Sequence, residues 1–391
     1  MLRPCEPASW RVWPEQAMAQ ATLVSERLCG DLQQPISAMA WSVDGEFLAI
    51  TSTGGELLLL DFRAGCEELL RGDHDSSLDV VGFSGDGQFL MAAGQGGELL
   101  LWELGGSRVR PLAMDPIPLG GGWIDAAAWQ PGGLLLAVAV GRELRLWDGA
   151  RRQWREPPLQ LPGTIQALAW SADGVQLAAS CHGEVVLWQP CLSSPADPPL
   201  RHAMLRHAIA SAGLALTFSG PGHHLACGML DRSLLVWPRG CHGQPWQFSG
   251  FPAKVRQLAW SDQPGRLAPL LASAAADAVI LWAQVKQGSK AWQPEPLLWH
   301  EKRVNALAFA PGSTLLASAS NDGSVALWDS RGRMLQPLEG QGGGFNALAW
   351  RPDGRHLAAG DANGRWWLWP VDVPPRERQG QRPGAGFKLR Q

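Results

Sequence analysis

A single pattern recurs eight times along this 391-residue chain. An apolar residue is followed, after two residues of any type, by a second apolar residue and, after one more, by an aromatic residue; a tight turn and a leucine complete the pattern. In the fifth copy Gly213 takes the first apolar position. The aromatic residue and the leucine are seven residues apart in every copy except the sixth, which contains four extra residues. Chance does not keep such a register, so we predict eight copies of one structural unit. The aromatic positions are Trp41, Phe83, Trp129, Trp170, Phe218, Trp260, Phe309 and Trp350.

Each copy is predicted to form short β-strands. Apolar residues alternate before the aromatic residue, as in a strand with a buried face, and an Asp-Gly or Pro-Gly pair then marks a tight turn. A second strand of small residues follows, and a third strand ends in tryptophan in every copy but the first, which ends at Leu57 to Asp61. The two aromatic positions account for 12 of the chain's 21 tryptophans. The third-strand tryptophans are Trp102, Trp147, Trp188, Trp237, Trp282, Trp328 and Trp369.

A period of 41 to 49 residues with a closing Trp-Asp pair, kept at Trp147-Asp148 and Trp328-Asp329, resembles the WD40-repeat β-propeller family. The resemblance implies an all-β fold of eight blades, each of four antiparallel strands, over residues 20–370. It also implies that an N-terminal outer strand, here placed at Ala21 to Arg27, closes the last blade. The alternative is a seven-bladed ring that leaves the first copy outside. Residues 1–19 would be an extension and residues 371–391 a disordered basic tail.

The same resemblance implies a hydrogen-bonded tetrad of His, Ser or Thr, Asp and Trp within a blade. The residue types suit such a chain, because an indole N–H can only donate, a hydroxyl or imidazole can donate and accept, and a carboxylate accepts. Only the seventh copy carries the complete set. Its members are His300, Ser318 (or Ser320), Asp322 and Trp328.

The sequence favours a non-enzymatic protein. No GxxxxGK, GxGxxG, HExxH or GxSxG motif occurs, although a propeller enzyme with a channel site remains the alternative. A net charge of -3 and a pI near 6.3 argue against nucleic-acid binding. We find no secretory signal and no stretch clean enough to span a bilayer, and the seven cysteines form no CxxC pair. We therefore expect a cytoplasmic monomer that needs no cofactor.

A cluster of cysteine and histidine residues is the one feature that suggests a metal. Ten of the chain's 16 Cys and His residues lie between residues 181 and 242. Thiolate and imidazole ligands suit zinc, but the spacing matches no zinc module, and solvated loop histidines are the simpler interpretation. The candidate metal ligands are Cys191, His223, His224, Cys241 and His242.

The tryptophans outside the repeat positions indicate where a partner protein binds. Trp299 stands before His300, and Trp123 immediately precedes the first strand of the third copy, so both are expected on the top face of the propeller. Arg256 and Arg303 flank apolar positions near the same channel mouth. Because Trp and Arg are favoured interface anchors, we predict a scaffold that binds another protein through this face, with metal handling by the Cys/His loops as the alternative.

Overall fold

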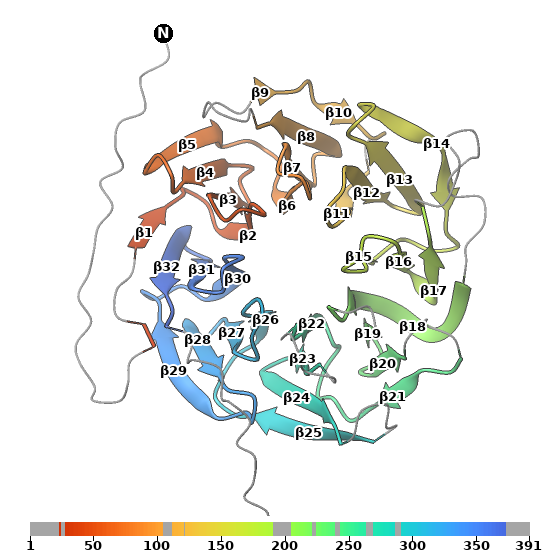
Figure 1. Ribbon diagram of the computed structural model, residues 1–391, viewed down its shortest axis with the longest axis vertical. Coiled ribbons are helices and arrows are strands. Elements are labelled where there is room, and N and C mark those ends of the chain that lie inside the picture. Colours follow the sequence, from red (N-terminus) through yellow and green to blue (C-terminus); the bar gives the residue numbers. More distant parts are fainter. Residues whose placement is uncertain are drawn as a thin grey trace, which may run out of the picture.

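The computed structural model describes residues 23–24, 28–104, 112–120, 122–190, 205–220, 224–238, 243–262, 269–285 and 291–372, and all regular structure in these ranges is β. Its strands form eight antiparallel blades around a central channel (Figure 1). The innermost strand of each blade contacts that of the next, and the last contacts the first. The prediction of eight blades is therefore confirmed, and the first copy lies inside the ring instead of outside it as in the seven-bladed alternative.

We letter the strands of each blade a to d from the channel outward. Blade 1 contains β2 (Ile36–Trp41), β3 (Phe47–Ser52), β4 (Leu57–Asp61) and β5 (Cys66–Arg71). Blade 2 contains β6 (Leu78–Phe83), β7 (Phe89–Gly94), β8 (Glu98–Glu103) and two short outer strands that both pair with β8, namely β9 (Leu112–Ala113) and β10 (Ile117–Pro118). Blade 3 contains β11 (Ile124–Trp129), β12 (Leu135–Val140), β13 (Glu143–Asp148) and β14 (Gln153–Gln160). Blades 4 and 5 contain β15 (Ala167–Trp170), β16 (Leu177–Ser180), β17 (His182–Trp188), β18 (Leu205–Phe218), β19 (Leu225–Met229), β20 (Leu234–Trp237) and β21 (Trp246–Phe248). Blades 6 to 8 contain β22 (Gln257–Trp260), β23 (Leu271–Ala275), β24 (Ala278–Gln284) and β25 (Trp292–Leu297); β26 (Val304–Phe309), β27 (Leu316–Ser320), β28 (Ser324–Trp328) and β29 (Met334–Glu339); and β30 (Phe345–Trp350), β31 (His356–Asp361), β32 (Arg365–Pro370) and β1 (Leu28–Asp31).

Blades 4 and 5 share one strand. β18 pairs with β17 as the outer strand of blade 4 and then with β19 as the inner strand of blade 5. Gly213 lies where the two pairings meet. A Cβ atom at this position would lie 2.7 Å from the sulfur of Cys227 and 2.8 Å from the Cβ atom of Ser180. Glycine therefore replaces the apolar residue of the other copies because no side chain fits.

The N-terminal strand closes the ring, but not at the predicted residues. β1 pairs antiparallel with β32, with Leu28 opposite Leu368 and Asp31 opposite Arg365. Of the predicted span Ala21 to Arg27, only Leu23 and Val24 are described, and neither lies in a strand. Their backbone N–H groups instead donate to Gln336 on the outer strand of blade 7. The closing strand thus begins later in the sequence than we predicted.

The hydrophobic core is divided into eight clusters, one between each pair of neighbouring blades. In β32, Trp367 and Trp369 face blade 7, with their rings stacked at 6.3 Å, whereas Trp366 faces blade 1. This alternation is the period of two expected for a strand that is buried on both faces. The seam between blades is therefore the unit of apolar packing.

Hydrogen bonds from indoles cross five of these seams. Each strand-a tryptophan donates its Nε1–H to the carbonyl oxygen of the residue that precedes the aromatic position in the preceding blade. The pairs are Trp41 with Ala349 (3.1 Å), Trp129 with Gly82 (3.2 Å), Trp170 with Ala128 (3.0 Å), Trp260 with Thr217 (3.3 Å) and Trp350 with Ala308 (3.0 Å). The three copies with phenylalanine at this position have no such donor, which gives the tryptophan-rich repeat a physical reason.

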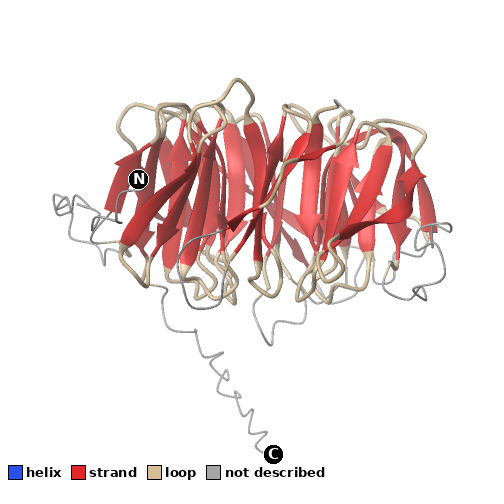
Figure 2. Cartoon of the chain, turned by 90° about the horizontal axis from the view of Figure 1, so that it is seen from above, coloured by secondary structure: helices blue, strands red, loops and turns tan. Residues whose placement is uncertain are grey.

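The strands run between two faces that carry the loops (Figure 2). Because neighbouring strands are antiparallel, the b–c turns and the connections from strand d to the next strand a all lie on one face. We call this the top face, and the opposite one the bottom face. Within the described ranges, we find no helix with the length and apolar character needed to cross a membrane.

Candidate functional site

The top end of the channel is ringed by one residue from each blade. In six blades the pairing of strands a and b slips by one residue directly after the first apolar position, so that the next residue is left out of the ladder. Such a bulge re-aims a side chain. The residues at this position, one in each blade, are Ser37, Asp79, Asp125, Gln166, Leu214, Arg256, Asn305 and Asn346.

On one side of this ring the side chains form hydrogen bonds to the neighbouring blade, and on the other side they line a cavity. On blades 7, 8 and 1, Asn305 donates to the Phe345 carbonyl oxygen at 2.9 Å, Asn346 donates to that of Ile36 at 3.1 Å, and Ser37 donates to that of Leu78. These side chains hold neighbouring blades together. The ring side chains of blades 3 to 6 instead line a cavity.

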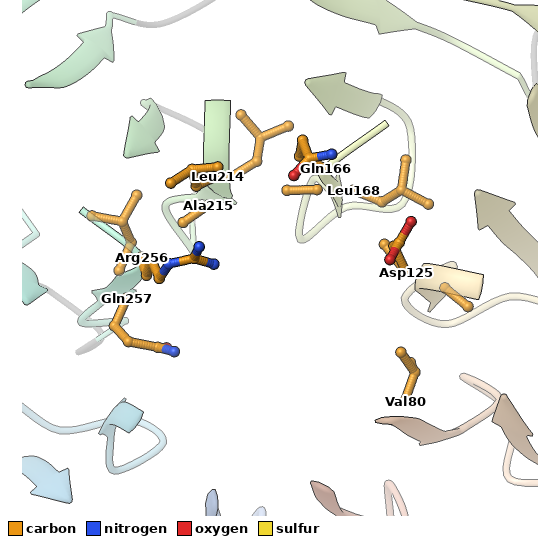
Figure 3. A pocket seen from close by; sticks show the side chains of 13 residues that line it. Val80, Asp125, Gln166, Leu168, Leu214, Ala215, Arg256 and Gln257 are labelled. Carbon is orange, nitrogen blue, oxygen red and sulfur yellow. The ribbon is translucent and has the colours of Figure 1, made fainter. Parts of the chain in front are cut away.

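This cavity has a volume of about 330 Å³ and lies between the inner strands of blades 2 to 6. Asp125 and Arg256 stand on facing sides of it, with Gln166 and Leu214 between them (Figure 3). Apart from Gln257, the rest of its lining is apolar and consists of Val80, Ala126, Ala127, Ala167, Leu168, Ala215, Leu216 and Leu258. A cavity with apolar walls and a few convergent polar groups is the usual form of a binding site.

The two sides of the channel mouth carry opposite charge. Burial raises the pKa of the Asp125 carboxyl above its ordinary value, and the negative charge of Asp79 on the neighbouring blade 2 raises it further. Across the mouth, Lys254, Arg256, Lys302 and Arg303 are all exposed. Among the described residues, none of these four cations and neither of the two carboxylates forms an ion pair.

A buried tetrad fixes the loop that follows β25. His300, whose side chain is fully buried, hydrogen-bonds through Nδ1 to Asp322 at 2.9 Å and through Nε2 to Ser318 at 2.8 Å. Trp328 Nε1 donates to the same Ser318 hydroxyl at 2.8 Å, and the backbone N–H of Glu301 donates to Asp322 at 3.1 Å. The serine of this network is Ser318 and not its alternative, Ser320, which donates to the Lys302 carbonyl oxygen.

The Asp322 carboxylate is held in its charged form. Burial opposes ionisation, but hydrogen bonds from the Ser324 side chain and backbone and from His300 outweigh it, so the pKa of Asp322 lies below its ordinary value. A closed chain of this kind is stiff in a low dielectric. The tetrad thereby fixes the backbone immediately after Trp299.

The structure divides the four predicted partner-binding residues between two sides of the mouth. Trp299 is 44% exposed on the loop before blade 7, and Arg303 and Arg256 are exposed at the starts of blades 7 and 6. Trp123 is 62% exposed but lies at the start of blade 3, on the acidic side beside Asp125. All four lie on the top face, where the connections from strand d to strand a run.

Sequence reasoning missed two parts of this region. Leu298 is 83% exposed directly before Trp299, and nothing in its residue type distinguishes it from the many buried leucines. The acidic wall of Asp79 and Asp125 could have been found, because both occupy the position immediately after the first apolar residue of the repeat. Arg256 was singled out at this same position.

The candidate metal ligands are not assembled in the described part of the chain. Cys191, His223, Cys241 and His242 lie outside the described residues. His224 is described and is buried against aromatic rings, with centroids 5.5 Å from Trp260 and 5.8 Å from Trp246. Within the described ranges, no group of three or more His, Cys, Asp or Glu residues could hold a metal ion.

Comparisons with known proteins match this architecture. Residues 295–329 and 332–370 match the family model "WD domain, G-beta repeat". The chain is 32% identical over 127 residues to THO complex subunit 3 of Arabidopsis thaliana, a stretch that covers 29% of this chain and 36% of that protein. It is 23% identical over 202 residues to WD repeat-containing protein 1 of Rattus norvegicus, covering 40% of this chain and 33% of that protein. The chain thus spans about a third of the length of these relatives.

Solved structures share the fold over most of the chain. Sqt1 from Chaetomium thermophilum, in a structure bound to the N-terminus of the ribosomal protein L10, superposes with a TM-score of 0.71 at 17% identity, covering 87% of this chain and 98% of that one. The computationally designed Ika8 protein superposes with a TM-score of 0.68 at 20% identity and the same coverage. At these identities the likeness concerns the fold.

Proposed function

Because this chain belongs to the WD40-repeat family, we propose that it is a non-enzymatic scaffold that binds a partner protein through the top face of its propeller. The binding residues are Trp299, Arg303 and Arg256 on one side of the channel mouth and Trp123 on the other. The likeness to Sqt1, whose structure holds the N-terminus of the ribosomal protein L10, supports a protein as the partner.

The observation that carries this proposal is the rigid display of an exposed apolar pair. Leu298 and Trp299 project into solvent, whereas the next residue, His300, is buried and bonded to both Asp322 and Ser318. A binding loop that is already ordered loses little conformational entropy when a partner docks. Exposed tryptophan on a preorganised backbone is what an interface anchor requires.

The experiment is affinity capture of partner proteins by the full chain, followed by mass spectrometry. We expect a partner that binds the wild-type chain and that is lost from the Trp299→Ala and Trp123→Ala variants. Val285 is 59% exposed in the c–d loop of blade 6, on the bottom face, so Val285→Ala serves as the control and should retain the partner. Capture that Val285→Ala abolishes and that both tryptophan variants retain would place the interface on the other face.

A further inference from the structure

Two neighbouring loops of the top face form one surface that is both apolar and positively charged. Leu298, Trp299, Lys302 and Arg303 come from the connection between blades 6 and 7, and Lys254 and Arg256 from the connection between blades 5 and 6. We call these six residues the basic–aromatic surface. All six are exposed, and Leu298 is the most exposed large apolar residue in the described part of the chain.

The charges of this surface have no partner within the described protein. None of its four cations forms an ion pair in the described ranges, although nine other arginines pair with Asp or Glu there. Glu301 is the only acid in these two connections, both of which lie within the described residues. The b–c turns beside them add Asp231, Asp277 and the Asp322 carboxylate of the tetrad. Across the mouth, the connection into blade 2 and the residues that begin the inner strands of blades 2 and 3 expose four acids, which are Asp73, Asp75, Asp79 and Asp125.

We propose that the basic–aromatic surface binds an acidic segment of the partner protein that also carries an apolar side chain. This inference rests on the proposed function and names the chemistry of the partner. The apolar side chain would pack on Leu298 and Trp299, removing their surface from water. The carboxylates would pair with Lys302, Arg303 and Arg256, whose planar guanidinium groups suit bidentate bonds to a carboxylate.

The acidic side of the channel mouth, formed by Asp79 and Asp125, determines the orientation in which the segment binds. Arg256 belongs both to the basic–aromatic surface and to the rim of the 330 Å³ cavity, so a segment that lies on blades 6 and 7 continues toward Asp125. Carboxylates are repelled from that side, because like charges placed together at an interface cost free energy. The acidic residues are thereby kept on blades 6 and 7, and the end of the segment over the cavity is neutral or basic.

The same features disfavour a nucleic acid as the ligand. A phosphate backbone needs a continuous basic track, and its charge repeats at every nucleotide. Here the track is interrupted by Glu301 and ends at the wall of Asp79 and Asp125. The overall charge of -3 gives no long-range attraction for a polyanion.

The test is selection of binding peptides from a displayed library of random dodecapeptides on the immobilised full chain. We expect the selected sequences to be enriched in Asp and Glu next to an apolar residue. Fluorescence anisotropy of one selected peptide should then show affinity that falls about tenfold or more in the Lys302→Glu/Arg303→Glu variant and falls with added salt. The matched control, Asp73→Lys/Asp75→Lys, reverses two exposed charges on the other side and should bind at least as tightly.

The outcomes separate the two proposals. Peptides whose affinity depends on Trp299 but that show no acidic enrichment would overturn the acidic partner and leave the top-face scaffold standing. If the wild-type chain selects no peptide and captures no protein, the proposed function itself fails. A labelled single-stranded RNA or DNA oligonucleotide that binds the wild type and not Lys302→Glu/Arg303→Glu would assign the surface to nucleic acid, against our inference.

Discussion

The indole Nε1–H of Trp170 in blade 4 donates a 3.0 Å hydrogen bond to the carbonyl oxygen of Ala128 in blade 3. The same bond is made from Trp41, Trp129, Trp260 and Trp350 to the blade before each. One residue type thus both fills the apolar seam and satisfies a backbone carbonyl in it. Unpaired polar groups in a buried seam would be costly.

Trp170→Phe tests this bond. Phenylalanine occupies the equivalent position in blades 2, 5 and 7, so the ring should fit, but the Ala128 carbonyl oxygen loses its indole donor. We expect the free energy of unfolding to fall by about 1 kcal/mol, measured by urea denaturation. The control is Trp123→Phe, at a 62% exposed site, which should change stability by less than about 0.5 kcal/mol. Equal effects of the two variants would show that the bond contributes nothing.

Ser318 should contribute more to the free energy of unfolding than Ser273, its counterpart in blade 6, because it belongs to the tetrad. Ser318 bonds both Trp328 and His300. Ser273 accepts a 2.9 Å hydrogen bond from Trp282, but Phe251, which lies nine residues before the aromatic position as His300 does in blade 7, cannot form the second bond. Ser318→Ala should therefore leave two buried groups without a partner and cost roughly 2–4 kcal/mol, and Ser273→Ala about half of that. Urea midpoints measure both. A larger loss from Ser273→Ala would contradict this reading of the tetrad.

Glu56 anchors the connection between the closing strand and the first blade. Its buried carboxylate accepts the backbone N–H groups of Gln33 and Gln34 at 3.2 and 3.1 Å and the Ser52 hydroxyl at 2.8 Å. We expect Glu56→Ala to destabilise the protein by about 2 kcal/mol and to speed amide hydrogen exchange in β1. Glu67→Ala, at an exposed site on the outer strand of blade 1, should leave exchange in β1 unchanged. Unaltered protection of β1 in Glu56→Ala would rule out this anchoring role.

Asp361 at the end of β31 is predicted to weaken the fold at neutral pH. One of its oxygens accepts the backbone N–H groups of Asn363 and Arg365, but the other is buried with no hydrogen-bond partner among the described residues. Burial raises the pKa of this carboxyl above its ordinary value of 3.8. Because the folded state then binds the proton more tightly than the unfolded state, the penalty is present above the folded pKa and disappears as pH falls toward 3.8.

Asp361→Asn removes that ionisation. The variant should be more stable than the wild type at pH 7, and the gain should shrink as pH is lowered through the folded pKa, as followed by urea denaturation across pH. Asp115→Asn, at an exposed site, should be neutral within about 0.5 kcal/mol at every pH. A gain for Asp361→Asn that does not vary with pH would mean that ionisation is not its source.

Much of the fold could be predicted because the repeat pattern is local. The aromatic position, the turn and the leucine each reflect pairing within one blade, and the strands β26, β27 and β28 lie where the seventh copy predicts them. The closing strand could not be placed, because β1 pairs with a strand more than 330 residues later. Its register is set by that distant partner and by Glu56, not by a pattern of its own.

The candidate site depended still more on tertiary structure. Trp299, Trp123, Arg256 and Arg303 could be singled out as residues that the repeat does not use, and the structure exposes all four. Only the closed ring shows that three of them stand together with Leu298 and face the wall of Asp79 and Asp125. The sequence by itself determined the repeated unit, since each copy encodes its own hairpins. The tertiary structure decided which side chains share a surface, because ring closure brings together blades that are far apart along the chain.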